Sequence, residues 1–149
     1  MLIEAVGIGM FLSLIMTEMI GLAAGGIVVP GYIALVLHNP IQVVSTILAG
    51  IITFLIVKVI SFYIIIYGRR LLIVSILVGY LIAYFTKISP ILAIDSLSLN
   101  IETVGFVIPG LIAYWIARQG IIPTLSAMII VSSLVRLVII IIHNGVVIQ

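Results

Sequence analysis

One nine-residue phrase occurs twice in this chain, and it constrains the fold more than any other feature. The segment 26–34, Gly-Ile-Val-Val-Pro-Gly-Tyr-Ile-Ala, returns 79 residues later at 105–113 as Gly-Phe-Val-Ile-Pro-Gly-Leu-Ile-Ala. The repeat predicts that the protein is a duplicated half. Each copy places a helix-breaking Pro-Gly pair inside apolar sequence, which a bilayer tolerates only where neighbouring protein or a watery cavity satisfies the freed backbone groups.

Composition places these breaks in a membrane protein. Hydrophobic residues make up 65% of the 149 positions and charged residues 7%, whereas a soluble domain has roughly 45–50% and 25%. We therefore predict an all-α polytopic membrane protein with a single domain, 1–149, whose repeat halves are about 1–68 and 69–149. A transmembrane helix needs ~20 apolar residues. Four runs approach or exceed that length: 2–20, 41–66, 71–86 and 121–142.

The Pro-Gly pairs lie in two shorter apolar stretches, 26–37 and 105–117. At ~1.5 Å per residue neither crosses a bilayer alone, so each is predicted to be a broken or re-entrant helix beside about four full spans. If each stretch re-enters, the halves have two spans and are parallel, whereas three spans would make them inverted. Arg118 distinguishes the cases, since it lies outside in the first and inside in the second. The sequence leaves both open.

The third long run, 71–86, is the shortest and needs the neighbouring Lys87 to snorkel toward the headgroups. The loop before it, Tyr67-Gly68-Arg69-Arg70, holds the densest positive charge in the chain. The positive-inside rule places this loop in the cytoplasm, where its two arginines could also contact an acidic partner. The segment 89–103 is the least apolar part of the chain and is predicted on the outer side.

No catalytic constellation is present in the sequence. It has no Gly-Lys-Ser or Gly-Lys-Thr phosphate loop, no His-Glu-x-x-His and no nucleophile elbow. Without cysteine there is no thiolate chemistry, and the isolated His38 and His143 favour an interfacial role over metal binding. A net charge of +2 gives no indication of nucleic-acid binding. We therefore expect no catalytic residue, metal site or cofactor in this chain.

Two cations lie inside apolar runs, where a charge near the bilayer centre costs at least ~2.5–3.5 kcal/mol and usually faces protein or water. Lys58 follows Gly31 by 27 positions and Arg136 follows Gly110 by 26, so the duplication places one cation at nearly the same depth in each half. Facing a shared cavity, the two would suit an anionic substrate. Alternatively, each long side chain snorkels to the headgroups.

The Pro-Gly pairs also allow two interpretations. Half-helices that start after Pro30 and Pro109 would present free N–H groups and positive dipole ends, and two such ends facing each other would favour an anion near the middle of the membrane. Alternatively the pairs only kink packed helices, although their duplication argues against chance. Glu18, at the end of the first run, could pair with a basic residue of the second half or of a partner, or be a solvated carboxylate.

Taken together, the motifs resemble those of the CapC/PgsC family, the small membrane subunit of the bacterial poly-γ-glutamate synthase. They occur in the family's order and spacing over essentially the whole chain. The motifs are Thr17-Glu18, the first phrase extended to Val36, Tyr67-Gly68-Arg69-Arg70, and 107–113 followed by Arg118-Gln119-Gly120. Lys58 and Arg136 lie outside these motifs, so no family role is assigned to them.

The resemblance implies a plasma-membrane complex that joins glutamate through γ-amide bonds and extrudes the polymer as capsule or released product. In that family a separate subunit is the amide ligase, to which ATP and magnesium belong, and a largely extracellular subunit anchored by one span is associated with export or attachment. This chain would anchor the ligase and help translocate the polymer as part of an oligomer. Candidate path residues are Pro30, Gly31, Lys58, Pro109, Gly110 and Arg136. Candidate partner contacts are Glu18, Arg69, Arg70, Arg118 and Gln119.

Two other functions remain open from the residues alone. A small autonomous transporter acting as an oligomer would also use short spans with a carboxylate in the first. Against it, Glu18 lies at a helix end, and such a carrier has no need of duplicated Pro-Gly breaks. The third possibility is a purely structural scaffold without a passage.

Overall fold

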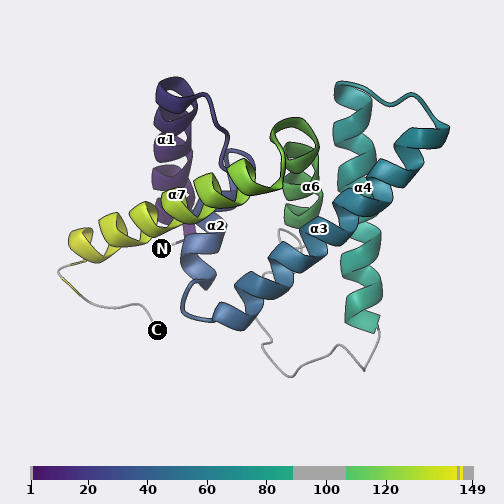
Figure 1. The fold of residues 1–149 in the computed structure, drawn as a ribbon. Coiled ribbons are helices and arrows are strands. Elements are labelled where there is room, and N and C mark those ends of the chain that lie inside the picture. Colours follow the sequence, from purple (N-terminus) through teal and green to yellow (C-terminus); the bar gives the residue numbers. More distant parts are fainter. Residues whose placement is uncertain (1, 89–106, 144, 146–149) are drawn as a thin grey trace. The chain divides into compact units, whose positions relative to one another are not determined.

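The computed structural model describes residues 2–88, 107–143 and 145, and over these ranges the protein is all-helical (Figure 1). The predicted all-α class is confirmed for this part of the chain, whereas the predicted outer segment 89–103 lies outside the described residues. The helices are α1 (Leu2–Ile20), α2 (Val29–Val36), α3 (Pro40–Tyr63), α4 (Arg69–Ile88), α6 (Ile108–Gln119) and α7 (Ile121–Ile142).

Three of the described helices are long and apolar enough to cross a membrane. Their apolar spans are Ile3–Ile20, Gln42–Tyr63 and Ile121–Ile142, close to three of the four predicted runs. The fourth run forms α4, which is not among the three candidates. Helix α4 has 20 residues, or about 30 Å at ~1.5 Å per residue, and its role as a fourth span stays a prediction.

Proline and glycine residues lie at the helix boundaries near both copies of the repeated phrase. Pro30 and Pro109 lie in the first turns of α2 and α6, where a missing backbone N–H breaks no helical hydrogen bond. Gly21, with φ of 76°, follows the last residue of α1, and Gly120, with φ of 98°, separates α6 from α7. Both glycines adopt the left-handed backbone region, which other residues rarely enter.

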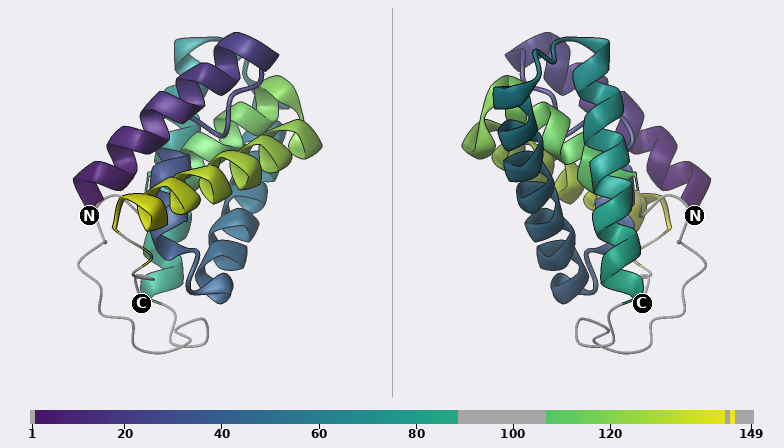
Figure 2. Two further views of the ribbon diagram at one scale, coloured as in Figure 1. Left: turned by 90° about the vertical axis from the view of Figure 1, so that its left-hand side faces the viewer. Right: turned by 90° about the vertical axis from the view of Figure 1, so that its right-hand side faces the viewer.

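The chain forms two compact units that do not follow the two sequence halves. The first unit comprises Met1–Val44 with Arg118–Gln149, and the second comprises Ser45–Ala117. In the first unit α1, α2 and α7 contact one another in pairs. The second unit holds α4, α6 and most of α3, and α3 and α4 run in opposite directions on either side of their short link (Figure 2). Each unit therefore joins two described helices of one half to a long described helix of the other.

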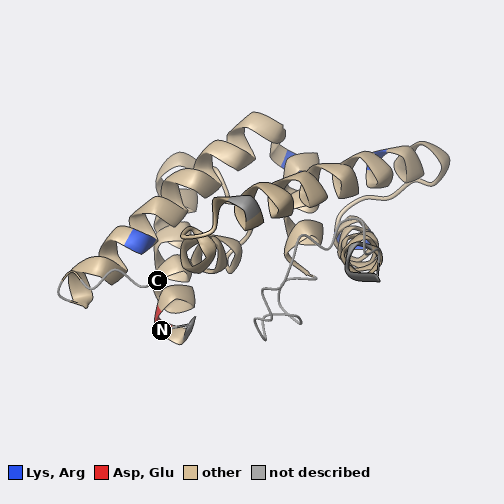
Figure 3. Cartoon of the chain, turned by 90° about the horizontal axis from the view of Figure 1, so that it is seen from below, with Lys and Arg blue, Asp and Glu red and all other residues tan. Residues whose placement is uncertain are grey.

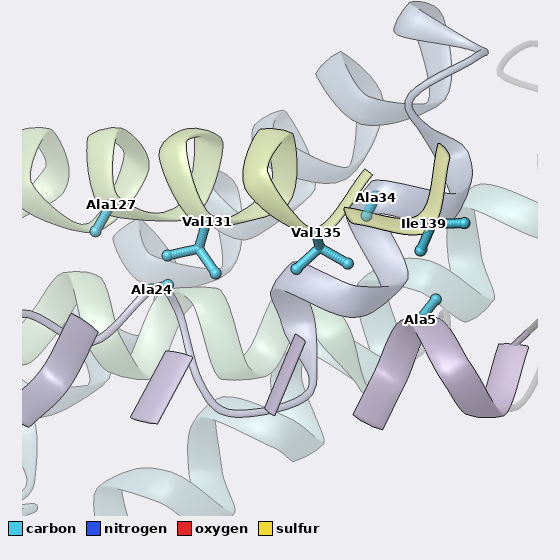
Figure 4. Close-up of a cluster of buried hydrophobic side chains, with 7 residues drawn as sticks. All are labelled: Ala5, Ala24, Ala34, Ala127, Val131, Val135 and Ile139. Carbon is cyan, nitrogen blue, oxygen red and sulfur yellow. The ribbon is translucent and has the colours of Figure 1, made fainter. Parts of the chain in front are cut away.

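The core of the first unit is built mainly from small side chains (Figure 4). One residue comes from each of α1, α2 and the stretch between them, and four come from one face of α7. The cluster consists of Ala5, Ala24, Ala34, Ala127, Val131, Val135 and Ile139. On α1 the large side chains Phe11, Leu14 and Met19 are exposed instead. Small residues inside and large apolar residues outside are typical of helices that pack closely in lipid.

Candidate functional site

The first Pro-Gly pair lies directly against the backbone of α1. A Cβ atom added to Gly31 would lie 2.7 Å from the carbonyl oxygen of Ala5 and 2.8 Å from the Cα of Val6. A Cβ added to Gly9 would lie 2.7 Å from the Cα of Gly31. Because both contacts are with backbone atoms, no flexible side chain can move aside. Glycine at both positions is what allows the two segments to approach so closely.

The second Pro-Gly pair makes the same contact with α4. A Cβ on Gly110 would lie 2.5 Å from the Cα of Ile76 and 2.6 Å from the carbonyl oxygen of Ser75, and a Cβ on Gly79 would lie 2.5 Å from the nitrogen of Gly110. Ser75 and Gly79 follow Ala5 and Gly9 by 70 positions each. The sequence analysis missed these partner positions, although a small residue at every fourth position of each helix was a signal for them.

The stretch between α1 and α2 runs back along α1 instead of turning away from it. Ser13 Oγ donates to the carbonyl oxygen of Gly26 at 3.3 Å, and farther along, Gly31 reaches the level of Ala5. The contacts run in opposite order along the two segments, so the return is antiparallel. From Ile20 to Ala5 the path covers about 22 Å at ~1.5 Å per residue, and α2 continues beyond it. The stretch and the start of α2 together therefore extend back along most of the length of α1.

The backbone freed by this break is satisfied by the side chain of Gln119. Ala23 N–H donates to Gln119 Oε1 at 2.7 Å, and Gln119 Nε2 donates to the carbonyl oxygen of Ala23 at 2.8 Å. The same Nε2 lies 3.4 Å from Thr124 Oγ1, whose hydroxyl donates to the carbonyl oxygen of Gly120. The backbone N–H and C=O of the buried Ala23 thus both have hydrogen-bond partners, as the membrane environment requires. Gln119 was predicted as a partner contact, and the structure places its amide inside the first unit.

The first turns of α2 and α6 are buried. In α2 this turn packs on α1, and in α6 it packs on α4. Each helix start therefore faces its neighbouring helix within its own unit. The anion site predicted between the two starts stays a prediction.

Charged side chains are sparse along the described helices (Figure 3), and the two predicted path cations have different surroundings. Arg136 is partly buried and lines a cavity of about 20 Å³ with Ala34, Leu35, Ile139 and Ile140. Among the described residues it has no ion-pair partner. Lys58 is exposed in the second unit, and its Nζ lies 5.8 Å from the centroid of the Phe54 ring.

Lys58 and Arg136 lie on different faces of their helices, and the alignment of α3 with α7 explains why. Thr53 and Ser132, both fully buried and 79 positions apart, each donate a hydroxyl to the carbonyl oxygen four residues earlier. In this register the counterpart of Arg136 is Val57, which is 2% exposed. Lys58 comes one residue later, which rotates it by roughly 100° around the helix. The two cations share a depth along their helices but not a face.

The remaining predicted contact residues lie at helix ends. Glu18 is exposed near the end of α1, and Arg69 and Arg70 are exposed at the start of α4. Arg118 is exposed near the end of α6, where it has an interaction of its own. These four residues lie where a partner could reach them, and their roles stay predictions.

The sequence analysis missed one histidine–carboxylate contact of the first unit. His143 Nε2 lies 3.5 Å from Glu4 Oε2, which joins the end of α7 to the start of α1. Both residues stand at helix ends, but nothing in the sequence pairs them. Over the described residues no group of three or more His, Cys, Asp and Glu side chains could hold a metal ion.

Comparison with known proteins adds a family and two relatives. The profile of the family described as "Capsule biosynthesis CapC" matches residues 8–125. A "PGA biosynthesis protein CapC" of Bacillus subtilis (strain 168) is 33% identical over 127 residues, 84% of this chain and 84% of the relative. A "Capsule biosynthesis protein CapC" of Bacillus anthracis is 35% identical over 130 residues, 86% of each chain. No solved structure matches the chain.

Proposed function

Because the chain belongs to the CapC family of capsule-biosynthesis proteins, we propose that it is the membrane subunit of a poly-γ-glutamate synthase in the bacterial plasma membrane. The observation that carries this proposal is the family match over residues 8–125, together with relatives named for capsule and PGA biosynthesis. In this role the chain anchors an ATP-dependent amide ligase and helps the product leave the cell.

The division of labour follows from the chemistry that each part needs. Joining glutamate units through amide bonds consumes ATP, and the sequence of this chain has no Gly-Lys-Ser or Gly-Lys-Thr phosphate loop. ATP and magnesium therefore belong to the partner ligase. A second partner, anchored by one span and largely extracellular, receives or attaches the polymer. Arg69 and Arg70 at the exposed start of α4 are the proposed contacts for an acidic cytoplasmic surface.

The polymer carries one carboxylate per residue, so it needs a lined passage through the hydrocarbon. The cavity of about 20 Å³ in the first unit has space for one small polar group and not for a chain. The passage is therefore proposed to run between copies of this protein or between it and its partners. An oligomer follows from the same argument, because the wall of such a passage needs more than one chain.

The two Pro-Gly contacts support an internal duplication with inverted halves. In each unit the glycine of the pair lies against two small residues four positions apart on one long helix, α1 or α4. The return along α1 gives the first half three passes: α1, the stretch ending in α2, and α3. After an odd number of passes the chain has changed sides of the membrane. A second half built in the same way therefore has the inverted topology. Arg118 then lies on the same side as Arg69 and Arg70.

The proposed role is tested by purifying the tagged chain from its native membrane in mild detergent and identifying by mass spectrometry what accompanies it. We expect a ligase with a nucleotide-binding motif, in fixed proportion to this chain. An assembly of this chain alone that drives substrate flux in liposomes would overturn the proposal in favour of an autonomous transporter.

A further inference from the structure

We propose that Arg136 and the cavity beside it bind one carboxylate group of a γ-glutamyl chain. The site deepens the proposed function and rests on it, because it names the part of the polymer that this protein would hold. Its walls are the last turn of α2, which contributes Ala34 and Leu35, and one face of α7, which contributes Arg136, Ile139 and Ile140. All of these residues belong to the first unit.

The charge of Arg136 is uncompensated within the described protein. It lies six residues before the end of α7, about 9 Å from that end at ~1.5 Å per residue. A cation at such a depth is costly unless it meets water or a counter-ion. Glu4, a described acid of the same unit, lies 3.5 Å from His143. His143 is seven residues beyond Arg136 on α7, or roughly 10 Å. Among the described residues, the cavity therefore has a cation without a partner anion.

The size and lining of the cavity select the ligand. A volume of about 20 Å³ exceeds the ~10–15 Å³ that one water needs, so one small group fits and a polymer backbone does not. The other four lining side chains are apolar, which makes a charged hydrogen bond at the guanidinium stronger than in water. A guanidinium presents paired N–H donors that match the two oxygens of a carboxylate. The chain to which that carboxylate belongs would lie outside the cavity, along the protein surface.

The experiment measures binding of a γ-linked glutamate pentamer to the purified chain in nanodiscs of zwitterionic lipid, by calorimetry at fixed ionic strength. The matched probe is the γ-linked isoglutamine pentamer, which has the same length and carries a neutral α-carboxamide in place of each free α-carboxylate. We expect the first to bind and the second to bind at least tenfold more weakly, because charge-assisted hydrogen bonds are roughly twice as strong as neutral ones. Equal binding of the two probes would overturn the proposal.

Variants test whether binding of the glutamate pentamer depends on the cavity. Arg136→Gln is expected to weaken binding of the glutamate pentamer at least tenfold, and Arg136→Lys less, since it keeps the charge but loses the paired donors. Lys58→Gln removes an exposed cation of the second unit and is expected to change binding less than twofold. The double variant Arg136→Leu with Leu137→Arg keeps the net charge but moves the cation to the exposed position that corresponds to Lys58. It is expected to bind as weakly as Arg136→Gln.

Each variant is first checked for helical circular dichroism and a single elution peak. Wild-type affinity in a folded Arg136→Gln chain contradicts the proposal. Full affinity in the moved-cation variant also contradicts it, because binding would then follow charge and not the cavity. In a further arm, nanodiscs that contain phosphatidylglycerol test a lipid headgroup as the occupant, and loss of pentamer binding there would assign the cavity to lipid. The outcome is independent of ligase copurification, so failure of this site and failure of the proposed function are distinguishable.

Discussion

The two units of this protein share a backbone contact and differ in their chemistry. In each, the glycine of a Pro-Gly pair lies against a long helix, at Ala5 and Gly9 in one case and at Ser75 and Gly79 in the other. In the first unit Arg136 lines a cavity, whereas in the second unit Lys58, one residue out of register, is exposed beside Phe54. The comparison teaches that the two units share a backbone framework, while anion binding is expected once per chain.

Replacing the glycine of either Pro-Gly pair is expected to have the largest effect. Gly31→Leu and Gly110→Leu would each force side-chain atoms into backbone at 2.5–2.8 Å, so we expect at least a tenfold loss of folded protein in the membrane. Gly7→Leu is the matched control, because a Cβ there meets nothing within 4 Å. Detergent-resistant yield by fluorescence-detected chromatography measures the effect. Tolerance of leucine at only one of the two pairs would break the equivalence of the units.

Loss of the Gln119 amide is expected to have the next largest effect, and to be confined to the first unit. Gln119→Leu leaves the N–H and C=O of Ala23 without partners, at roughly 1–3 kcal/mol for each buried group. Because the chain has no cysteine, an Ala24→Cys reporter can be labelled cleanly. Ala24 is fully buried, so we expect protection from a water-soluble maleimide that Gln119→Leu removes.

A cysteine at Met19, which is 81% exposed, serves as the positive control for labelling and should react with and without Gln119. Continued protection of the reporter at Ala24 in the Gln119→Leu background would mean that the amide does not hold the stretch between α1 and α2.

The smallest expected effect is at Ser75. Its Oγ is buried and has no hydrogen-bond partner among the described residues, whereas the first unit has Ala5 at the corresponding position. Ser75→Ala removes an unsatisfied polar group and makes the second unit more like the first. We expect stabilisation of up to about 1 kcal/mol, seen as a higher melting temperature in detergent. A lower melting temperature would show that the hydroxyl has a partner in the membrane.

The apolar runs predicted the long helices because length and hydropathy alone decide whether a segment suits the bilayer. The Pro-Gly phrase likewise predicted two short broken helices, seen as α2 and α6. The fourth run forms the helix α4, and its role as a fourth span stays a prediction. Each of these features depends on residues that are neighbours in the chain, so the sequence alone can predict it.

The features that sequence could not supply depend on contacts between distant residues. Gln119 binds Ala23 across 96 positions, and no local pattern links them. The one-residue difference between Lys58 and Val57 looked like a slip in alignment, yet it moves a cation from a buried face to an exposed one. The compact units also exchange α3 and α7 between the sequence halves, which hydropathy does not encode.

The central claim is that this chain serves poly-γ-glutamate production through a carboxylate site in its first unit. The most direct measurement is the polymer found outside cells that lack the chain and carry either the wild type, Arg136→Gln or Lys58→Gln, at equal membrane levels. The account predicts no polymer without the chain, full recovery with wild type and Lys58→Gln, and severalfold less with Arg136→Gln. Full export without the chain, or undiminished export with Arg136→Gln, would contradict it.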